Sequence, residues 1–176
     1  MSAEGPPQGT RPPGGTARSD ARGDHASASL APPLRVGERF ARHVVFDLAS
    51  IRQFATLSGD FNPLHHDVAV AAKSRFGDII VSGPHIVALM LGLDATWLTE
   101  RFDAVGLHFD FRFVKAIPAG TALTLEWTVT SCLPKESLAG FVVEVEGRAF
   151  DDSGTVFTTG HGANLVRVPV SSMETS

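Results

Sequence analysis

The chain lacks the residues and motifs that several classes of protein require. It has a single cysteine, Cys132, so no intrachain disulfide can form. It contains no His-Glu-x-x-His pattern and no paired cysteines, which argues against a zinc site. Neither Gly-x-Gly-x-x-Gly nor a P-loop pattern occurs, so nothing predicts a nucleotide cofactor. Cys132 ends a strand pattern with no marked partner, and we expect it to be a structural thiol.

Long apolar runs and an excess of basic charge are also missing. No stretch approaches the ~20 apolar residues of a membrane-spanning helix, and none near the N-terminus has the length of a signal-peptide core. The formal net charge is −4, whereas nucleic-acid binders carry basic patches. We therefore expect a soluble, cytoplasmic protein with no membrane and no nucleic-acid partner.

The composition changes sharply along the chain. Residues 1–33 are dominated by Pro, Gly, Ala and Ser and show no periodicity, which predicts a disordered tail. Residues 34–170 carry most of the large apolar side chains, and a chain that is 43% hydrophobic can fill one core without disulfides. We expect one domain over 34–170 and a flexible C-terminus over 171–176.

Alternating polarity predicts strands in the C-terminal half. In the segment 105–114, four apolar residues alternate with polar ones, which gives one apolar face: Leu107, Phe109, Phe111 and Phe113. Similar alternation predicts strands within 123–130, 141–146 and 156–168, and an earlier strand over 40–46. A helix over 84–98 has almost no polar face, so we expect it to be covered nearly all round. A sheet of about five antiparallel strands wrapped around this central helix gives an α+β fold.

The loop Ser-Gly-Asp-Phe-Asn-Pro-Leu-His, residues 58–65, holds the best candidates for chemistry. It places Asp60 five residues before His65 across a turn that Gly59 permits and Pro63 stiffens. A carboxylate and an imidazole on one stiff loop can share a water molecule, as the addition of water to a double bond requires. The same composition is also typical of an ordinary structural turn.

Helices are predicted on both sides of this loop. Ser50 to Gln53 has the form of a capping box, which predicts a helix start at Ser50, and Asp67 is a plausible N-cap for a short second helix. Gly83 begins the long apolar helix, where free backbone amides point outward.

This arrangement, with Ser-Gly-Asp-x-Asn-Pro-x-His, Asp67, an Ala-Ala helix, Phe-Gly and Ile-x-x-Gly, resembles the hydratase motif of the MaoC-like, R-specific enoyl-CoA hydratases of the hotdog superfamily. The resemblance covers most of residues 34–170, and the segment 54–83 is its specific part. It implies a single hotdog fold and a lyase of fatty acid metabolism that hydrates an enoyl-CoA or dehydrates a 3-hydroxyacyl-CoA.

The resemblance also implies roles for individual residues. Asp60 and His65 match the catalytic pair, and Gly83 matches the glycine whose amide polarises the thioester carbonyl. Asn62 matches a residue that supports the loop, while Ser82 stands where the family often has histidine, a change that bears on substrate choice. The resemblance implies no metal, no cofactor beyond the coenzyme A of the substrate, and a homodimer or dimer of dimers with sheets joined edge to edge.

Two other functions stay open on this fold. Thioester hydrolysis would need a carboxylate near the carbonyl, which Asp60, Asp67 or Glu100 could supply, and a non-catalytic acyl-CoA-binding subunit would need no catalytic pair. Substrate contacts are harder to assign. Candidates for the phosphates of coenzyme A are Lys73, Arg75, Arg112 and Lys115. Candidates for the acyl tunnel are Phe54, Val81, Leu89, Met90, Trp97 and the strand phenylalanines.

Overall fold

The computed structural model describes residues 31–169 of the chain. The predicted tail lies outside these residues except for 31–33, and so does the predicted flexible segment 171–176. The elements in chain order are β1 (Arg39–Val45), α1 (Leu48–Ser58), the 3-10 turn η1 (Pro63–His65), α2 (Val68–Lys73), α3 (Gly83–Thr99), β2 (Asp103–Phe113), β3 (Ala122–Lys135), η2 (Glu136–Leu138), β4 (Gly140–Phe150) and β5 (Val156–Arg167).

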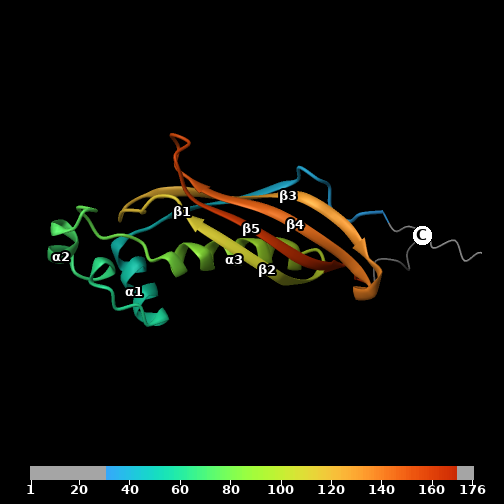
Figure 1. Cartoon of the computed structure of the whole chain (residues 1–176), viewed down its shortest axis with the longest axis horizontal. Helices are drawn as coiled ribbons and strands as arrows, with labels where there is room; N and C mark the ends of the chain where they lie inside the picture. The colour runs from blue at the N-terminus through green and yellow to red at the C-terminus, as the bar shows by residue number, and fades with distance from the viewer. Residues whose placement is uncertain (1–30, 170–176) are drawn as a thin grey trace, which may run out of the picture.

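The strands form one five-stranded antiparallel sheet in the order β1-β3-β4-β5-β2. The sheet curves over one side of α3, and α1 and α2 lie together at one end of the molecule (Figure 1). This arrangement confirms the predicted α+β hotdog architecture. Within residues 31–169, no helix is long and apolar enough to cross a membrane.

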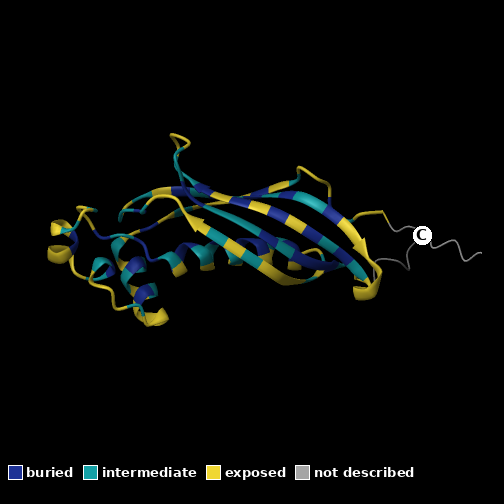
Figure 2. Ribbon diagram, viewed as in Figure 1, coloured by how far each residue is buried: buried dark blue, intermediate teal, exposed yellow. Residues whose placement is uncertain are grey.

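The core lies between α3 and the sheet. Buried and exposed residues alternate along β4, so one face of the sheet packs against the helix while the other meets solvent (Figure 2). Trp127 of β3 is fully buried, and its indole Nε1 donates a hydrogen bond to the carbonyl oxygen of Met90 in α3, at 2.9 Å. A Cβ at Gly147 would lie only 2.6 Å from the Trp127 ring, so glycine makes room for the indole. This contact fixes the middle of α3 on the sheet.

The prediction that α3 is covered nearly all round is wrong for the single chain. The sheet covers one side of the helix only, and a stripe of mostly small residues on the other side stays exposed: Pro84, Ala88, Gly92, Ala95, Thr96 and Thr99. The apolar surface on this side is small because the side chains are short, which lets the helix remain partly open in one chain.

The predicted apolar face of β2 is also interrupted. The pairing of β2 with β5 shifts between Gly106 and His108, so Leu107 is a bulged residue and is half exposed. Phe109 and Phe111 do face the core, where their ring centroids lie 5.9 and 6.1 Å from that of Trp127. β2 is an edge strand of the sheet. The alternation in its sequence therefore predicts burial correctly only for the residues next to Trp127.

Candidate active site

The end of α1 positions the candidate carboxylate. Gly59 adopts a left-handed conformation with φ +73°, which glycine reaches without a steric penalty. The amide of Asp60 then donates to the carbonyl oxygen of Ala55 at 2.8 Å, closing the helix end in the pattern of a Schellman motif. The backbone of Asp60 is therefore fixed by the last turn of the helix.

The start of α1 differs from the prediction by one turn. The N-cap is Asp47, whose carboxylate accepts from the amide of Ser50 at 2.8 Å, and Ser50 itself lies inside the helix. The predicted capping box at Ser50 is therefore wrong, because an aspartate three residues earlier satisfies the free amide instead. The predicted cap of α2 is confirmed, since Asp67 accepts from the amides of Ala69 and Val70.

Asn62 organises the loop between the two candidate groups. Its side-chain oxygen accepts from the amide of Leu64 at 3.1 Å and caps η1, where Pro63 is the first residue. The backbone amide of Asn62 donates to Asp60 Oδ1 at 3.2 Å. Asn62 therefore orients the Asp60 carboxylate and starts the turn that carries His65.

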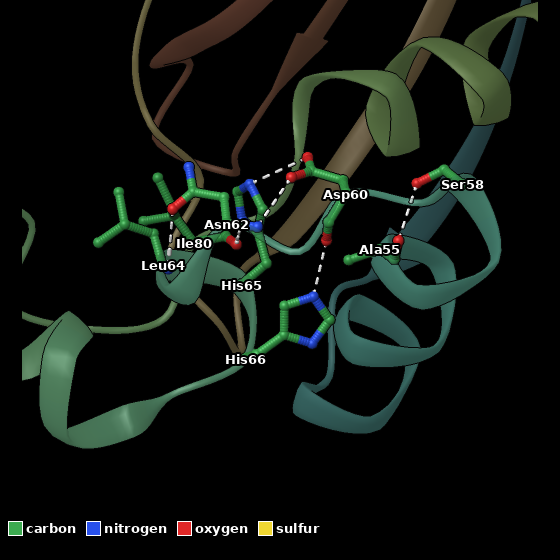
Figure 3. A network of polar contacts seen from close by, with 8 residues as sticks. All are labelled: Ala55, Ser58, Asp60, Asn62, Leu64, His65, His66 and Ile80. Atoms are coloured by element: carbon green, nitrogen blue, oxygen red, sulfur yellow. Dashed lines mark hydrogen bonds and ion pairs between the residues drawn. The ribbon is translucent and has the colours of Figure 1, made fainter.

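His65 and Asp60 lie in direct contact (Figure 3). His65 is buried, its Nδ1 lies 2.8 Å from the carbonyl oxygen of Ile80, and its Nε2 lies 3.3 Å from Asp60 Oδ2. A carbonyl oxygen can only accept, so Nδ1 carries the hydrogen in this contact. Nε2 is therefore the ring nitrogen that can exchange a proton beside the carboxylate.

His66, the residue after the candidate histidine, helps to hold the loop. Its Nε2 lies 2.7 Å from the backbone carbonyl oxygen of Asp60, an acceptor, so this nitrogen is the donor. The carbonyl oxygen of His66 in turn accepts from Arg52 Nε at 3.1 Å. The Arg52 contact ties the loop to α1, and Figure 3 shows the contact of His66 with the Asp60 carbonyl oxygen.

A cavity of about 370 Å³ opens beside this pair. It is lined by His65, Arg75, Phe76, Ile80, Val81, Gly83, Ile86, Phe113, Val114, Lys115, Ala116, Ile117 and Thr158. The amide of Gly83, at the first position of α3, has no hydrogen-bond partner among the described residues. A Cβ at this position would lie 2.8 Å from the Phe113 ring, so the backbone and the ring are close together. The structure thus brings His65 and Gly83, whose amide is free, to one cavity.

Three other predicted site residues, Asp60, Asn62 and Ser82, do not line this cavity. Asn62 acts on the loop, and Asp60 reaches the cavity wall through its contact with His65. Ser82 is buried at the N-cap of α3, and its hydroxyl has no hydrogen-bond partner within residues 31–169. Ser82 therefore makes no side-chain hydrogen bond to the loop, although its neighbours Val81 and Gly83 line the cavity.

The residues suggested for substrate contacts separate into two groups. Arg75 and Lys115 line the cavity, whereas Arg112 lies on the other face of the sheet in a second, polar hollow. Of the tunnel candidates, Val81 lines the cavity, but Met90 and Trp97 pack into the core, the latter 4.0 Å from the Phe40 ring between centroids. The sequence did not predict Thr158 and Phe76 as lining residues. The register of β5 decides whether Thr158 faces the cavity, and the path of the loop between α2 and α3 decides this for Phe76.

His85 anchors the start of α3 to α1. Its ring stacks on Phe54 with centroids 4.4 Å apart and meets Phe46 edge-on at 5.2 Å. Burial lowers the pKa of His85, and the nearby Asp47 carboxylate opposes the shift. A neutral imidazole is therefore favoured between the two aromatic rings. Within residues 31–169, no three His, Cys, Asp or Glu side chains gather as a metal site.

Comparison with known proteins gives three consistent results. The sequence profile of the "MaoC like domain" matches residues 33–147. The (R)-specific enoyl-CoA hydratase of Aeromonas caviae is 31% identical over 139 residues, which cover 79% of this chain and 98% of that protein.

Solved structures agree with this result. The (R)-hydratase from A. caviae involved in PHA biosynthesis superposes with a TM-score of 0.70 at 30% identity, covering 78% of this chain and all of that one. R-hydratase PhaJ1 from Pseudomonas aeruginosa gives 0.69 at 28% identity, covering 77% of this chain and 84% of that one.

Proposed function

This chain belongs to the MaoC-like domain family, and from that premise we propose that it is a hydro-lyase acting on coenzyme A thioesters. It adds water to an enoyl-CoA or removes it from a 3-hydroxyacyl-CoA. The observation that carries the proposal is the Asp60–His65 contact of 3.3 Å beside a cavity that also presents the Gly83 amide. This reaction needs two components: groups that transfer protons to and from a water molecule, and a hydrogen-bond donor to the carbonyl oxygen.

The Gly83 amide stabilises the charge that develops on the thioester. In this scheme the carbonyl oxygen lies at the free amide at the start of α3, where the helix dipole is positive. As water adds to the β-carbon, electron density moves through the α-carbon to this oxygen and forms an enolate. A donor already in place favours the enolate more than the ground-state carbonyl.

Asp60 and His65 carry the protons. Asp60 is the base that takes a proton from the attacking water, whose oxygen bonds to the β-carbon, and His65 orients that water through Nε2. A proton then returns to the α-carbon from the pair, which restores the thioester carbonyl. One water is added and no electrons are exchanged, so coenzyme A takes part only as a portion of the substrate and no other cofactor enters the scheme.

We further propose that two copies of the chain join through β2. This strand is at the edge of the sheet, and Val105 and Leu107 are each about half exposed there. Unpaired strand edges with apolar side chains are pairing surfaces. The exposed stripe on α3 would become covered in such an assembly, which would be a homodimer or a dimer of dimers.

A spectroscopic assay with crotonyl-CoA tests the reaction class. A hydratase removes the absorbance of the conjugated thioester without releasing free thiol, and we expect this result. Release of thiol would instead assign a thioesterase, for which Asp60 attacks or activates water at the carbonyl. If well-folded protein binds acyl-CoA but turns over no enoyl thioester, the chain is a binding subunit.

A further inference from the structure

A second cavity lies between α3 and β2, away from His65 and Gly83. It has a volume of about 140 Å³, and its lining is mostly apolar, with a polar pair: Leu91, Asp94, Ala95, Leu98, Thr99, Ala104, Val105, Gly106, Phe109 and Asn164. Asp94 of α3 and Asn164 of β5 are each only 2% exposed. An apolar pocket with a few placed polar groups is typical of a ligand site.

The polar pair has unused hydrogen-bonding capacity. Asn164 Nδ2 donates to Asp94 Oδ1 at 3.3 Å, and this is the one hydrogen bond of the Asp94 side chain among the described residues. The oxygens Asp94 Oδ2 and Asn164 Oδ1 have no partner there. Neither is fully enclosed, unlike the unpartnered atoms Ser82 Oγ, His85 Nδ1 and Thr158 Oγ1. Both remaining oxygens are acceptors, so the cavity offers two acceptors to a hydrogen-bond donor.

Keeping this carboxyl group in the protein is costly. Burial raises the pKa of Asp94 to about 6, against the opposing effect of the hydrogen bond from Asn164. At neutral pH the group is still mostly a carboxylate, so the protein keeps a buried charge that lowers its stability, whereas an apolar residue at this position would avoid that cost. Proteins often keep a residue that lowers stability where function requires it, and a buried carboxylate that faces a cavity fits this pattern.

The backbone of β2 keeps the space open next to Asn164. Gly106 has no side chain there, and a Cβ would lie 2.9 Å from the Phe109 ring and 3.7 Å from Asn164 Oδ1. The bulge at Leu107 directly follows this glycine, and Leu107 is half exposed and does not line the cavity. Both features leave the Asn164 oxygen accessible from within the cavity.

The two cavities are built on the same pair of elements. Gly83 and Ile86 of α3 with Phe113 of β2 line the catalytic cavity, whereas Asp94 and Phe109 line the second one. Eleven residues separate Gly83 from Asp94, a distance of about 16 Å along a helix. Between them α3 presents the half-buried Val87 and Leu91. An extended acyl chain whose thioester lies at Gly83 and which follows α3 therefore ends near Asp94.

We infer that the second cavity receives the far end of the acyl group, and that Asp94 and Asn164 select acyl groups that carry a hydroxyl or another hydrogen-bond donor at that end. The inference rests on the proposed function, since the thioester must lie at Gly83. A plain alkyl end would leave both acceptor oxygens without a partner, which is strongly unfavourable in a buried site. Asp94 is thus a specificity-determining residue rather than a catalytic one.

Matched substrates of equal length test this selection. We compare kcat/KM for trans-dodecenoyl-CoA, its ω-hydroxy counterpart and crotonyl-CoA, which is too short to reach Asp94. The native protein should prefer the hydroxylated chain over the plain one by about ten- to hundredfold. Asp94→Leu should abolish or reverse this preference and leave crotonyl-CoA turnover within about twofold, while Asp94→Asn, which keeps an acceptor oxygen, should retain part of it.

Two results would overturn the inference. One is a native protein that uses the plain chain as well as the hydroxylated chain. The other is an Asp94→Leu variant that loses activity equally on crotonyl-CoA and dodecenoyl-CoA, as a purely structural role would give. Failure of the proposed function is distinguishable, because crotonyl-CoA would then not react. Calorimetric binding of dodecanoyl-CoA and ω-hydroxydodecanoyl-CoA would still decide the selection, with tighter binding of the hydroxylated ligand expected only when Asp94 is present.

Discussion

His65 donates its Nδ1 hydrogen to the carbonyl oxygen of Ile80 at 2.8 Å, and the amide of Ile80 donates to the carbonyl oxygen of Leu64 at 3.1 Å. These two contacts join the turn that carries His65 to the segment that leads into α3. The segment begins the helix at Gly83 three residues later. One short stretch of backbone therefore sets both the ring orientation of the histidine and the position of the Gly83 amide.

Asn62→Ala should lower activity more than it lowers stability. The change removes the cap on the Leu64 amide, which costs about 1 kcal/mol of unfolding free energy. Because the turn also carries His65, we expect kcat on crotonyl-CoA to fall by about tenfold or more. Asn62→Asp keeps the capping oxygen and is the matched control for stability in urea unfolding. Equal kcat in Asn62→Ala and the native protein would show that the loop needs no such cap.

Gly83→Ala should impair catalysis through Phe113. The new Cβ would lie 2.8 Å from Phe113 Cζ, so the ring must move, and Phe113 is 56% exposed and free to do so. We expect a folded protein with a kcat/KM lowered by about tenfold or more, since both groups line the catalytic cavity.

The double variant Gly83→Ala with Phe113→Ala separates the clash from the loss of the glycine itself. If the clash is the cause, kcat/KM of the double variant should be higher than the product of the two single effects predicts. Simple multiplication of the two effects would contradict the proposed contact.

Asp94→Asn should stabilise the protein at neutral and alkaline pH. The carboxyl pKa is raised from 3.8 to about 6 by burial, so the folded state binds this proton more tightly than the unfolded state. The resulting stability is present below about pH 4 and is lost as the pH rises through about 6, by up to about 3 kcal/mol.

The amide variant lacks this loss and keeps an acceptor for Asn164. Thermal unfolding of both proteins should therefore show a higher midpoint for Asp94→Asn at about pH 8 and a difference that shrinks toward pH 4. A constant difference across this range would mean that folding does not raise the pKa of Asp94.

Local signals predicted most of the site. The loop from Ser58 to His65 was identified because turn residues with restricted conformations and two titratable side chains occur within eight positions. Gly83 was identified because a glycine and a proline precede a long apolar helix. The alternation of β3, β4 and β5 predicted the sheet, since strands with one buried face reveal that face in sequence.

Other features depend on contacts between distant segments. Ser50 and Asp47 can both cap a helix, and only the path of the chain after β1 decides between them. The burial of Asp94 depends on Asn164, which lies seventy residues further along the chain, and on the register of β5 against β2. The bulge at Leu107 likewise cannot be read from the sequence, because apolar and polar residues alternate through it without interruption.

The most direct test of the central claim is the rate of crotonyl-CoA hydration by the native protein, Asp60→Asn and His65→Gln, measured at equal folded concentration. Both substitutions nearly preserve shape but remove the proton-accepting group, so kcat should fall by about a hundredfold to ten-thousandfold in each. The double variant should be little worse than either single variant, because the two groups act on one water. Full activity in either single variant would contradict the account, since the 3.3 Å contact between Asp60 and His65 would then have no part in the reaction.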